Sequence, residues 1–254
     1  MLNLRLVILT VNWNQTEASI RDILWNACVR NQGYHYLTNE LDRKGFLFVL
    51  EGIDGSGKTS ACVILKERLQ NEGYEVVHLR EPTNESPWGK EIRERSPRAE
   101  LSPAEELDLF VKDREWHVQN KIRPALNAGK IVLMDRYFFA TGAYQSGATG
   151  IPWQEILRMN REDIHAPEPD VIFILDVDAE TGLSRTIGRK DKADLQFEKL
   201  DRLINVRKVY LKLVELDTGT YKVIDAHNPL ETVIDEIFND IIQRIKCRND
   251  SSQR

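Results

Sequence analysis

The chain has 254 residues, of which 41% are hydrophobic and 30% charged, and its formal net charge is -5. This balance is typical of a globular protein with one large domain, or with one domain and an appendage. The acidic charge argues against a nucleic-acid partner, because nucleic-acid binders usually carry a basic face. No apolar run approaches the roughly 18 residues of a membrane-spanning helix, so we expect no membrane partner.

The cysteines and the chain ends carry few further signals. Cys28, Cys62 and Cys247 lack metal-ligand spacing and do not form a disulfide framework. We therefore expect reduced thiols and a cytoplasmic protein. Because its beginning shows little periodic pattern, we divide the chain into an N-terminal extension of unknown role, a globular domain and a polar C-terminal tail. These parts span 1–43, 44–248 and 249–254.

Apolar runs predict the strands of the globular domain. They occur at 46–50, 75–80, 131–135, 171–177 and 221–225. Segments with helical periodicity separate or follow these runs, at 59–73, 103–129, 195–216 and 229–245. Strands that are apolar on both faces and alternate with helices predict an α/β fold. The expected architecture is a five-stranded parallel sheet with helices on both faces.

Local signals mark the ends of two of these helices. Ser102 and Glu105 have the spacing of a capping box at a helix N-terminus. Gly73 suits the C-terminal end of the first helix, because glycine readily adopts the left-handed conformation found there. Pro124 predicts a bend near the end of the helical segment 103–129.

A glycine-rich segment, EGIDGSGKTS (51–60), begins where the first predicted strand ends. Its residues Gly52, Gly57, Lys58 and Thr59 match the pattern G-x-x-x-x-G-K-[ST]. The glycines let the backbone fold around a phosphate, and the following helix turns its positive end toward the anion. Lys58 can contact the terminal phosphates, and the Thr59 hydroxyl can ligate Mg²⁺. The segment therefore predicts a site for a nucleoside triphosphate with Mg²⁺.

A phosphate loop occurs in kinases, GTPases and motors, so other segments must separate these classes. A GTPase would be expected to read guanine with N-K-x-D, and the nearest fragment, NKIR (120–123), lacks the aspartate. The chain is also short for a motor with its coupling elements. These observations favour a kinase.

Two further segments suit a phosphorylated acceptor with a flat base. Asp135 ends the strand at 131–135, where its carboxylate can act on Mg²⁺ or its waters, and Arg136 can fork onto a second phosphate. Phe110 and Arg114 are four residues apart and thus share one helix face. A ring and a guanidinium placed together can stack on a base and bind its exocyclic oxygen.

In their order along the chain, these segments resemble those of thymidylate kinases over about residues 45–245. The resemblance implies transfer of the γ-phosphate of ATP to dTMP, giving dTDP and ADP. The alternatives are a kinase for another nucleoside monophosphate and a weakly catalytic nucleotide-binding regulator. The segments that carry the resemblance are EGIDGSGKT (51–59), REPT (80–83), LFVKDREWH (109–117), DRYFFATGAYQ (135–145), PDVIFILDVD (169–178) and SRTIGRKDK (184–192).

The resemblance implies a role for each acceptor-binding residue. Asp54 would face the sugar 3′-hydroxyl, and Arg136 would hold the acceptor phosphate. Phe110 would stack on thymine, Arg114 would reach its O4, and Tyr144 would disfavour a 2′-hydroxyl. Completing the acceptor-binding set are Glu81, Pro82, Thr141 and Gln145.

The remaining implied sites concern ATP and the metal. The residues that the resemblance implies for ATP binding are Gly52, Ile53, Asp54, Gly55, Ser56, Gly57, Lys58, Thr59, Ser60, Arg185 and Arg189. The expected ligands of Mg²⁺ or its water shell are Thr59, Asp135 and Glu81. The implied catalytic residues are Lys58, Asp54, Arg136 and Arg189. The resemblance also implies a homodimer that takes small-molecule nucleotides.

A basic segment would form a lid over ATP at about 184–194. Some family members carry an arginine in the phosphate loop where this chain has Gly55. The resemblance implies that lid cations compensate, and Arg189 is favoured over Arg185 as the catalytic one. The cations clustered in the lid segment are Arg185, Arg189, Lys190 and Lys192.

Several positions depart from the family pattern. Thr83 and Ala140 stand where glycine and serine are common. Lys112 and Asp113 stand where smaller residues are common. None of these changes removes a group that phosphoryl transfer requires. Surface or capping roles are expected for histidines without metal-ligand spacing, namely His78, His117, His165 and His227.

Overall fold

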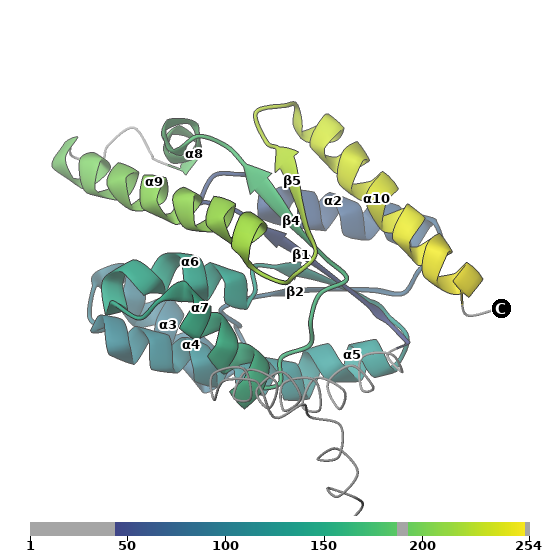
Figure 1. Cartoon of the computed structure of the whole chain (residues 1–254), viewed down its shortest axis with the longest axis horizontal. Helices are drawn as coiled ribbons and strands as arrows, with labels where there is room; N and C mark the ends of the chain where they lie inside the picture. The colour runs from purple at the N-terminus through teal and green to yellow at the C-terminus, as the bar shows by residue number, and fades with distance from the viewer. Residues whose placement is uncertain (1–43, 187–192, 252–254) are drawn as a thin grey trace, which may run out of the picture. The chain divides into compact units, whose positions relative to one another are not determined.

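The structure is a computed structural model, and it describes residues 44–186 and 193–251. Within these ranges a five-stranded sheet has the order β2-β3-β1-β4-β5, and every neighbouring pair of strands is parallel (Figure 1). This confirms the predicted fold class. The extension expected over 1–43 lies outside the described residues, and so do residues 187–192 of the lid expected at about 184–194.

The strands begin and end within one residue of the predicted positions. They are β1 (Phe46–Glu51), β2 (Val76–Arg80), β3 (Ile131–Asp135), β4 (Val171–Asp176) and β5 (Tyr221–Asp225). Strand β1 lies at the centre of the sheet between β3 and β4, and every residue in it is buried. Its apolar run therefore reflects a strand covered on both faces.

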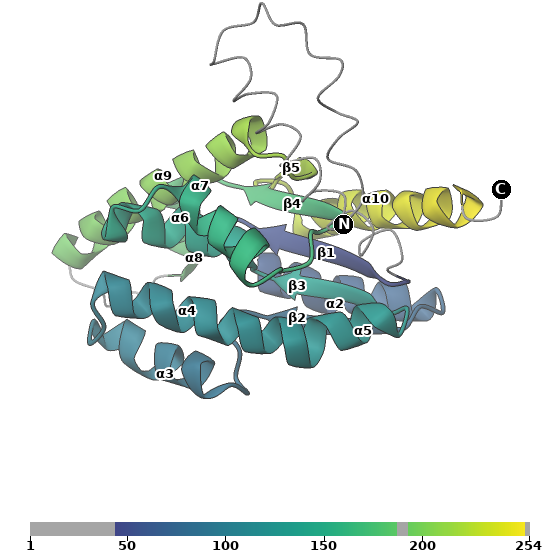
Figure 2. The ribbon, with the colours of Figure 1, turned by 60° about the horizontal axis from the view of Figure 1, so that its bottom comes forward.

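Helices cover both faces of the sheet. Helices α2 and α10 contact each other on one face, while α5 and α9 contact strands on the other (Figures 1 and 2). The helices are α2 (Lys58–Asn71), α3 (Pro87–Arg95), α4 (Pro103–His117), α5 (Arg123–Asn127), α6 (Phe138–Thr149), α7 (Trp153–Arg158), α8 (Ala179–Thr186), α9 (Ala193–Leu216) and α10 (Leu230–Ser251). Among the described helices, none is long and apolar enough to cross a membrane.

The local signals predicted at the end of the first helix and at the start of α4 agree with the structure. Gly73 follows α2 with φ 89°, and its N–H donates to the carbonyl of Gln70 at 3.0 Å. At the start of α4, the Glu105 N–H donates to the Ser102 hydroxyl, and the Glu105 carboxylate accepts from the Ser102 N–H at 2.8 Å. This is the predicted capping box. Helix α10 continues to Ser251, past the boundary placed at 248.

The bend expected at Pro124 takes the form of a wider turn. Helix α4 passes into a π-helical turn over Val118–Ile122, and α5 then begins with Pro124 in its first turn. Proline lacks the N–H that would continue the regular ladder, and its ring crowds the preceding turn. The π-helical turn accommodates the missing N–H and the ring of Pro124. Helices α4 and α5 therefore run in one line along the sheet (Figure 2).

Candidate active site

Two cavities open at the carboxyl ends of the strands. The larger has a volume of about 480 Å³ and the smaller about 350 Å³. Asp54, which follows β1, and Arg136, which follows β3, line both cavities. Open parallel sheets bind ligands at this edge, where the chain crosses over in opposite directions from neighbouring strands. The shared wall therefore places two ligands next to each other.

The smaller cavity contains the phosphate loop. Gly57 has φ 96°, a left-handed conformation that favours glycine, and α2 begins at the next residue. Lys58 is buried, and its ammonium donates to the Ile53 carbonyl at 2.7 Å and to the Ser56 hydroxyl at 3.1 Å. Burial, assisted by the nearby charge of Arg136, lowers the pKa of Lys58 to about 7. The loop thus presents a cation and a helix N-terminus to an incoming anion.

Thr59 and Asp135 form a second polar feature of this cavity. The Thr59 hydroxyl donates to Asp135 Oδ2 at 2.6 Å. The Arg80 Nε lies 3.6 Å from the same oxygen. The other carboxylate oxygen, Oδ1, is buried and has no hydrogen-bond partner among the described residues. A buried carboxylate oxygen without a partner is costly unless a cation or water satisfies it.

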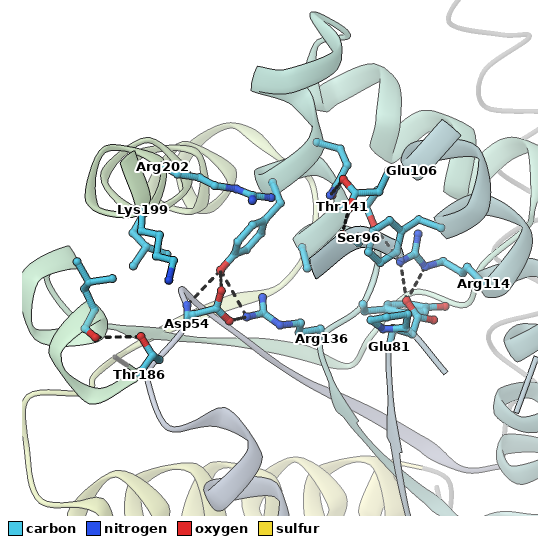
Figure 3. A pocket seen from close by; sticks show the side chains of 18 residues that line it. Asp54, Glu81, Ser96, Glu106, Arg114, Arg136, Thr141, Thr186, Lys199 and Arg202 are labelled. Atoms are coloured by element: carbon cyan, nitrogen blue, oxygen red, sulfur yellow. Dashed lines mark hydrogen bonds and ion pairs between the residues drawn. The ribbon is translucent and has the colours of Figure 1, made fainter. Parts of the chain in front are cut away.

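Asp54, Arg136 and Tyr144 meet at the wall between the cavities. Arg136 Nη2 lies 2.5 Å from Asp54 Oδ1 (Figure 3). The same nitrogen lies 3.4 Å from the Tyr144 hydroxyl. The backbone of Arg136 has φ 69°, which is unusual for a residue with a side chain and marks a constrained position. Burial opposes the charge on Asp54, but the nearby Arg136 and Lys58 lower the pKa of Asp54 overall.

The larger cavity brings together the nine predicted acceptor-binding residues. They come from the phosphate loop, the segment after β2, helix α4, the residue after β3 and helix α6. The nine residues are Asp54, Glu81, Pro82, Phe110, Arg114, Arg136, Thr141, Tyr144 and Gln145. Their roles toward a ligand remain predictions, but their convergence on one cavity is an observed property of the fold (Figure 3).

Arg114 is buried at one end of this cavity, with a side chain 1% exposed. Its guanidinium donates to Glu81 through Nε at 2.8 Å and Nη2 at 2.5 Å, to Asn160 at 2.8 Å and to Thr141 at 2.9 Å. The second carboxylate oxygen of Glu81 lies 3.1 Å from Nδ1 of His117. Both oxygens of Glu81 are therefore engaged by Arg114 and His117 in this structure, and its expected role at Mg²⁺ or the water shell of the metal stays a prediction.

The expected surface or capping role of His117 is wrong. The side chain is 3% exposed and faces Glu81. His117 follows Arg114 by three residues, so both lie on the same face of α4. This spacing from Arg114 could have indicated from the sequence that His117 faces the site.

Several lining residues were not predicted as site residues. Glu106 was detectable in principle, because it precedes Phe110 by four residues on the same helix face. The residues from α9 have no local motif, and the approach of that helix depends on the tertiary fold. The additional lining residues are Ser96, Glu106, Tyr137, Ala140, Leu183, Thr186, Lys199, Arg202 and Leu203.

Glu51 is a further residue that the sequence did not identify. It ends β1 and is fully buried, and its carboxylate accepts from the N–H groups of Tyr137 at 2.7 Å and Ala140 at 3.1 Å. It also accepts from the Tyr210 hydroxyl of α9 at 2.8 Å. Burial raises the pKa of Glu51 to about 7. The side chain joins the phosphate loop to α6 and α9.

Arg185 lines the smaller cavity from the end of α8. Its Nη1 donates to the carbonyls of Gly55 at 3.4 Å and Ala226 at 3.2 Å. A Cβ at residue 55 would lie 2.0 Å from the Gly182 carbonyl oxygen, so no side chain fits between the loop and α8. This packing explains why the phosphate loop carries glycine here. Arg189, the favoured catalytic cation, lies outside the described residues.

The sheet order, the phosphate loop at the end of the central strand and the two adjoining cavities define a P-loop fold of the nucleoside monophosphate kinase type. The family model described as thymidylate kinase matches residues 50–237. The chain therefore belongs to the thymidylate kinase family.

Relatives of known name agree with this assignment. A probable thymidylate kinase from Archaeoglobus fulgidus is 43% identical over 206 residues, which cover 81% of this chain and 100% of that protein. A thymidylate kinase from Xanthomonas euvesicatoria is 39% identical over 212 residues, covering 84% of this chain and 90% of the relative. One from Xanthomonas campestris is 40% identical over 198 residues, covering 78% and 83%, respectively.

Proposed function

We propose that the protein transfers the γ-phosphate of ATP to dTMP, giving dTDP and ADP. The observation that carries this proposal is the wall shared by the two cavities, to which Asp54 and Arg136 contribute. A donor in the smaller cavity and an acceptor in the larger one would meet at this wall. Family membership and the names of the relatives support the choice of dTMP.

In this proposal the smaller cavity holds the triphosphate of ATP. The loop backbone and the N-terminus of α2 face the phosphates, and Lys58 exchanges its bonds to Ile53 and Ser56 for bonds to phosphate oxygens. Arg185 contacts the loop at the Gly55 carbonyl, where its positive charge can neutralise part of the negative charge of the nucleotide.

The larger cavity holds the acceptor. Phe110 offers a ring for stacking on the base, and the buried guanidinium of Arg114 faces the base edge. Tyr144 is fixed beside Asp54 and Arg136, where its ring crowds a ribose 2′-hydroxyl. Arg136 exchanges its ion pair with Asp54 for the acceptor phosphate, and Asp54 then accepts from the sugar 3′-hydroxyl.

The reaction needs alignment and charge neutralisation more than acid–base catalysis. An acceptor phosphate oxygen, already anionic, attacks the γ-phosphorus, and the bond from that phosphorus to the bridging oxygen breaks. The leaving electron pair stays on the ADP oxygen. Lys58 and Arg136 stabilise the charge that spreads over the transferred group. No side chain has to remove a proton from the attacking oxygen.

The Thr59–Asp135 pair fits Mg²⁺, because it combines a hydroxyl with a carboxylate that has an unpartnered buried oxygen. When bound, the metal supplies positive charge to the phosphates of ATP. Thr59 and Asp135 would hold it or its waters. Asp135→Asn and removal of divalent cations with EDTA should each abolish turnover, whereas wild-type turnover that persists in EDTA would contradict this assignment.

The direct test of the proposed function is ADP release with different acceptors. ATP and Mg²⁺ are combined with dTMP, dUMP, dCMP, dGMP, AMP or ribothymidylate, each offered separately. We expect dTMP to exceed the others in kcat/KM by about tenfold or more, since unpaired polar groups in a pocket penalise the wrong base. A preference for another monophosphate would refute the assignment of thymine as the base. Turnover of ATP without any acceptor would refute the assignment of a kinase.

The proposal extends to location and assembly. Widely spaced cysteines support a cytoplasmic protein, and the resemblance to the family supports a homodimer. Light scattering coupled to size-exclusion chromatography tests the dimer, and a mass equal to that of one chain at micromolar concentration would refute it.

A further inference from the structure

Asp113 is a buried carboxylate next to the acceptor cavity. It lies on α4, is 1% exposed and accepts three hydrogen bonds from the loop after β2. The donors are the Thr83 N–H at 2.8 Å, the Thr83 hydroxyl at 2.6 Å and the Ser86 hydroxyl at 2.5 Å. A buried carboxylate that accepts three hydrogen bonds holds its donors firmly.

The same loop is packed tightly against α3. Ser86 caps that helix, accepting from the Gly89 N–H at 2.8 Å. A Cβ at residue 89 would lie 2.4 Å from the Thr83 carbonyl oxygen and 2.7 Å from Asp113 Oδ1, so this close approach requires glycine. The loop, the start of α3 and Asp113 therefore form one packed unit.

Helix α4 holds this loop at two successive positions. Asp113 accepts hydrogen bonds from Thr83. Its neighbour Arg114 donates to Glu81 (Figure 3). Pro82 lies between these anchors and lines the acceptor cavity, which Phe110 lines from α4. The Asp113 carboxylate and the Arg114 guanidinium thus hold the loop on either side of Pro82. These contacts constrain the distance across the cavity between Pro82 and Phe110.

We propose that Asp113 and Thr83 form a positioning pair that sets this separation and thereby the affinity for the acceptor nucleotide. The proposal rests on the proposed function. Asp113 is not among the described residues that line the cavity, so it acts through the loop rather than by touching the substrate. Without the pair, the loop would keep the bonds from Arg114 to Glu81 and from Arg93 of α3 to the Pro82 and Thr83 carbonyls. It would lose the bonds that tie Thr83 to α4, the helix that carries Phe110, and with them part of the constraint on the distance between Pro82 and Phe110.

The first test compares Thr83→Val with Thr83→Ser. Valine has nearly the shape of threonine but lacks the hydroxyl, whereas serine retains it. We expect Thr83→Val to raise the calorimetric Kd and the KM for dTMP about fivefold, consistent with the loss of one buried hydrogen bond. Thr83→Ser should stay within about twofold of wild type. The KM for ATP should stay within about twofold in both variants.

The second test measures coupling between the two residues. Asp113→Asn should raise the KM for dTMP about tenfold or more, because the loop donors lose their charged partner. Adding Thr83→Val to Asp113→Asn should cost less than the product of the two single effects. The matched control is Asp108→Asn, which removes an exposed carboxylate paired with Lys112 on the same helix. This variant should leave both KM values unchanged.

The outcomes separate this inference from the proposed function. If wild type does not phosphorylate dTMP, the proposed function fails. If wild type does so but Thr83→Val binds dTMP as tightly as Thr83→Ser, the positioning pair is refuted. Equal increases in the KM for ATP and for dTMP, or independent effects in the double variant, would also refute it. The conservative changes at Thr83 provide this test even where Asp113→Asn does not fold.

Discussion

Lys58 shows how one residue connects burial to ligand binding. In the free protein its ammonium is buried and donates to Ile53 and Ser56. Burial removes water from the charge, which lowers the pKa of Lys58 to about 7. A triphosphate placed beside this amine would favour its charged form and raise the pKa again. Binding of ATP should therefore be linked to proton uptake.

We predict that ATP binding takes up protons between about pH 7 and the usual lysine pKa of about 10.4, where the free protein lacks the Lys58 proton and the complex holds it. The apparent affinity for ATP should fall as pH rises through this window. Calorimetry at about pH 8.5 in two buffers of different ionisation enthalpy measures the uptake. Binding of dTMP in the other cavity serves as the control, and equal heats for ATP in both buffers would contradict the prediction.

At the scale of elements, the contact between α8 and the phosphate loop sets how closely this helix approaches the smaller cavity. A Cβ at residue 182 would lie 2.7 Å from the Asp54 carbonyl oxygen and 2.8 Å from the Ile53 side chain. Gly182 thus lets α8 rest directly on the loop backbone. Any side chain at this position must displace the helix, the loop or both.

We predict that Gly182→Ala raises the KM for ATP about tenfold, because the displaced loop presents its N–H groups less well to the phosphates. The KM for dTMP should change less. Ser184→Ala is the control, since Ser184 lies on the same helix and is exposed. Steady-state kinetics with each substrate varied in turn make the measurement, and an unchanged KM for ATP would show that the loop tolerates the added methyl group.

The end of α10 is a second element with a defined role in packing. Arg248 donates to Asp170 at 3.0 Å and to the Gly45 carbonyl at 2.7 Å, and its guanidinium lies 3.3 Å from the ring centroid of Phe46. These contacts join the last helix to the entrance of the central strand. They belong to residues that lie near opposite ends of the described chain.

We predict that Arg248→Ala lowers the free energy of unfolding by about 1–2 kcal/mol, through loss of the cation–π contact and the partly exposed ion pair. Lys246→Ala, an exposed change on the same helix, should have little effect. Urea denaturation followed by circular dichroism compares the two variants. Equal midpoints for Arg248→Ala and Lys246→Ala would count against the role of this contact.

Helices and strands with a clear periodic pattern were predicted from the sequence, whereas elements without such a pattern were missed. The five apolar strands and the long helices were found, because each has a clear pattern. Helix α6, with sequence FFATGAYQSGAT, was missed, since its glycines, threonines and aromatic residues have low helix propensity. The phosphate loop and the acceptor residues followed from spacing and resemblance. Glu51 and Asp113 were not recognised as anchors, because their partners are distant in sequence and become visible only in the fold.

At the scale of the whole molecule, charge is distributed unevenly. The chain has a net charge of -5, yet its substrates are anions. Cations concentrate at the carboxyl edge of the sheet, where the cavities lie. Positive groups inside a cleft focus the field there and attract anionic ligands even when the net charge of the chain is negative. The cations that line the two cavities include Lys58, Arg80, Arg114, Arg136, Arg185, Lys199 and Arg202.

We predict that a chain beginning at residue 44 folds and phosphorylates dTMP with a KM within about twofold of the full chain. The relative from Archaeoglobus fulgidus is matched over its whole length by 206 residues of this chain, and the family model begins at residue 50. A domain of this size can bury a sufficient core. Thermal unfolding and kinetics of the two chains test this, and loss of folding or of dTMP turnover in the shorter chain would contradict it.

The close contact between Gly55 and Gly182 also constrains how the protein can change over generations. An arginine introduced at residue 55 would meet the backbone of α8, so the mutation would be deleterious before its charge brought any benefit. Helix α8 would first have to move away from the loop, and that shift would weaken the position of Arg185. In this packing, a single substitution of Gly55 by arginine is therefore expected to strain the contact with α8 unless the helix has already shifted.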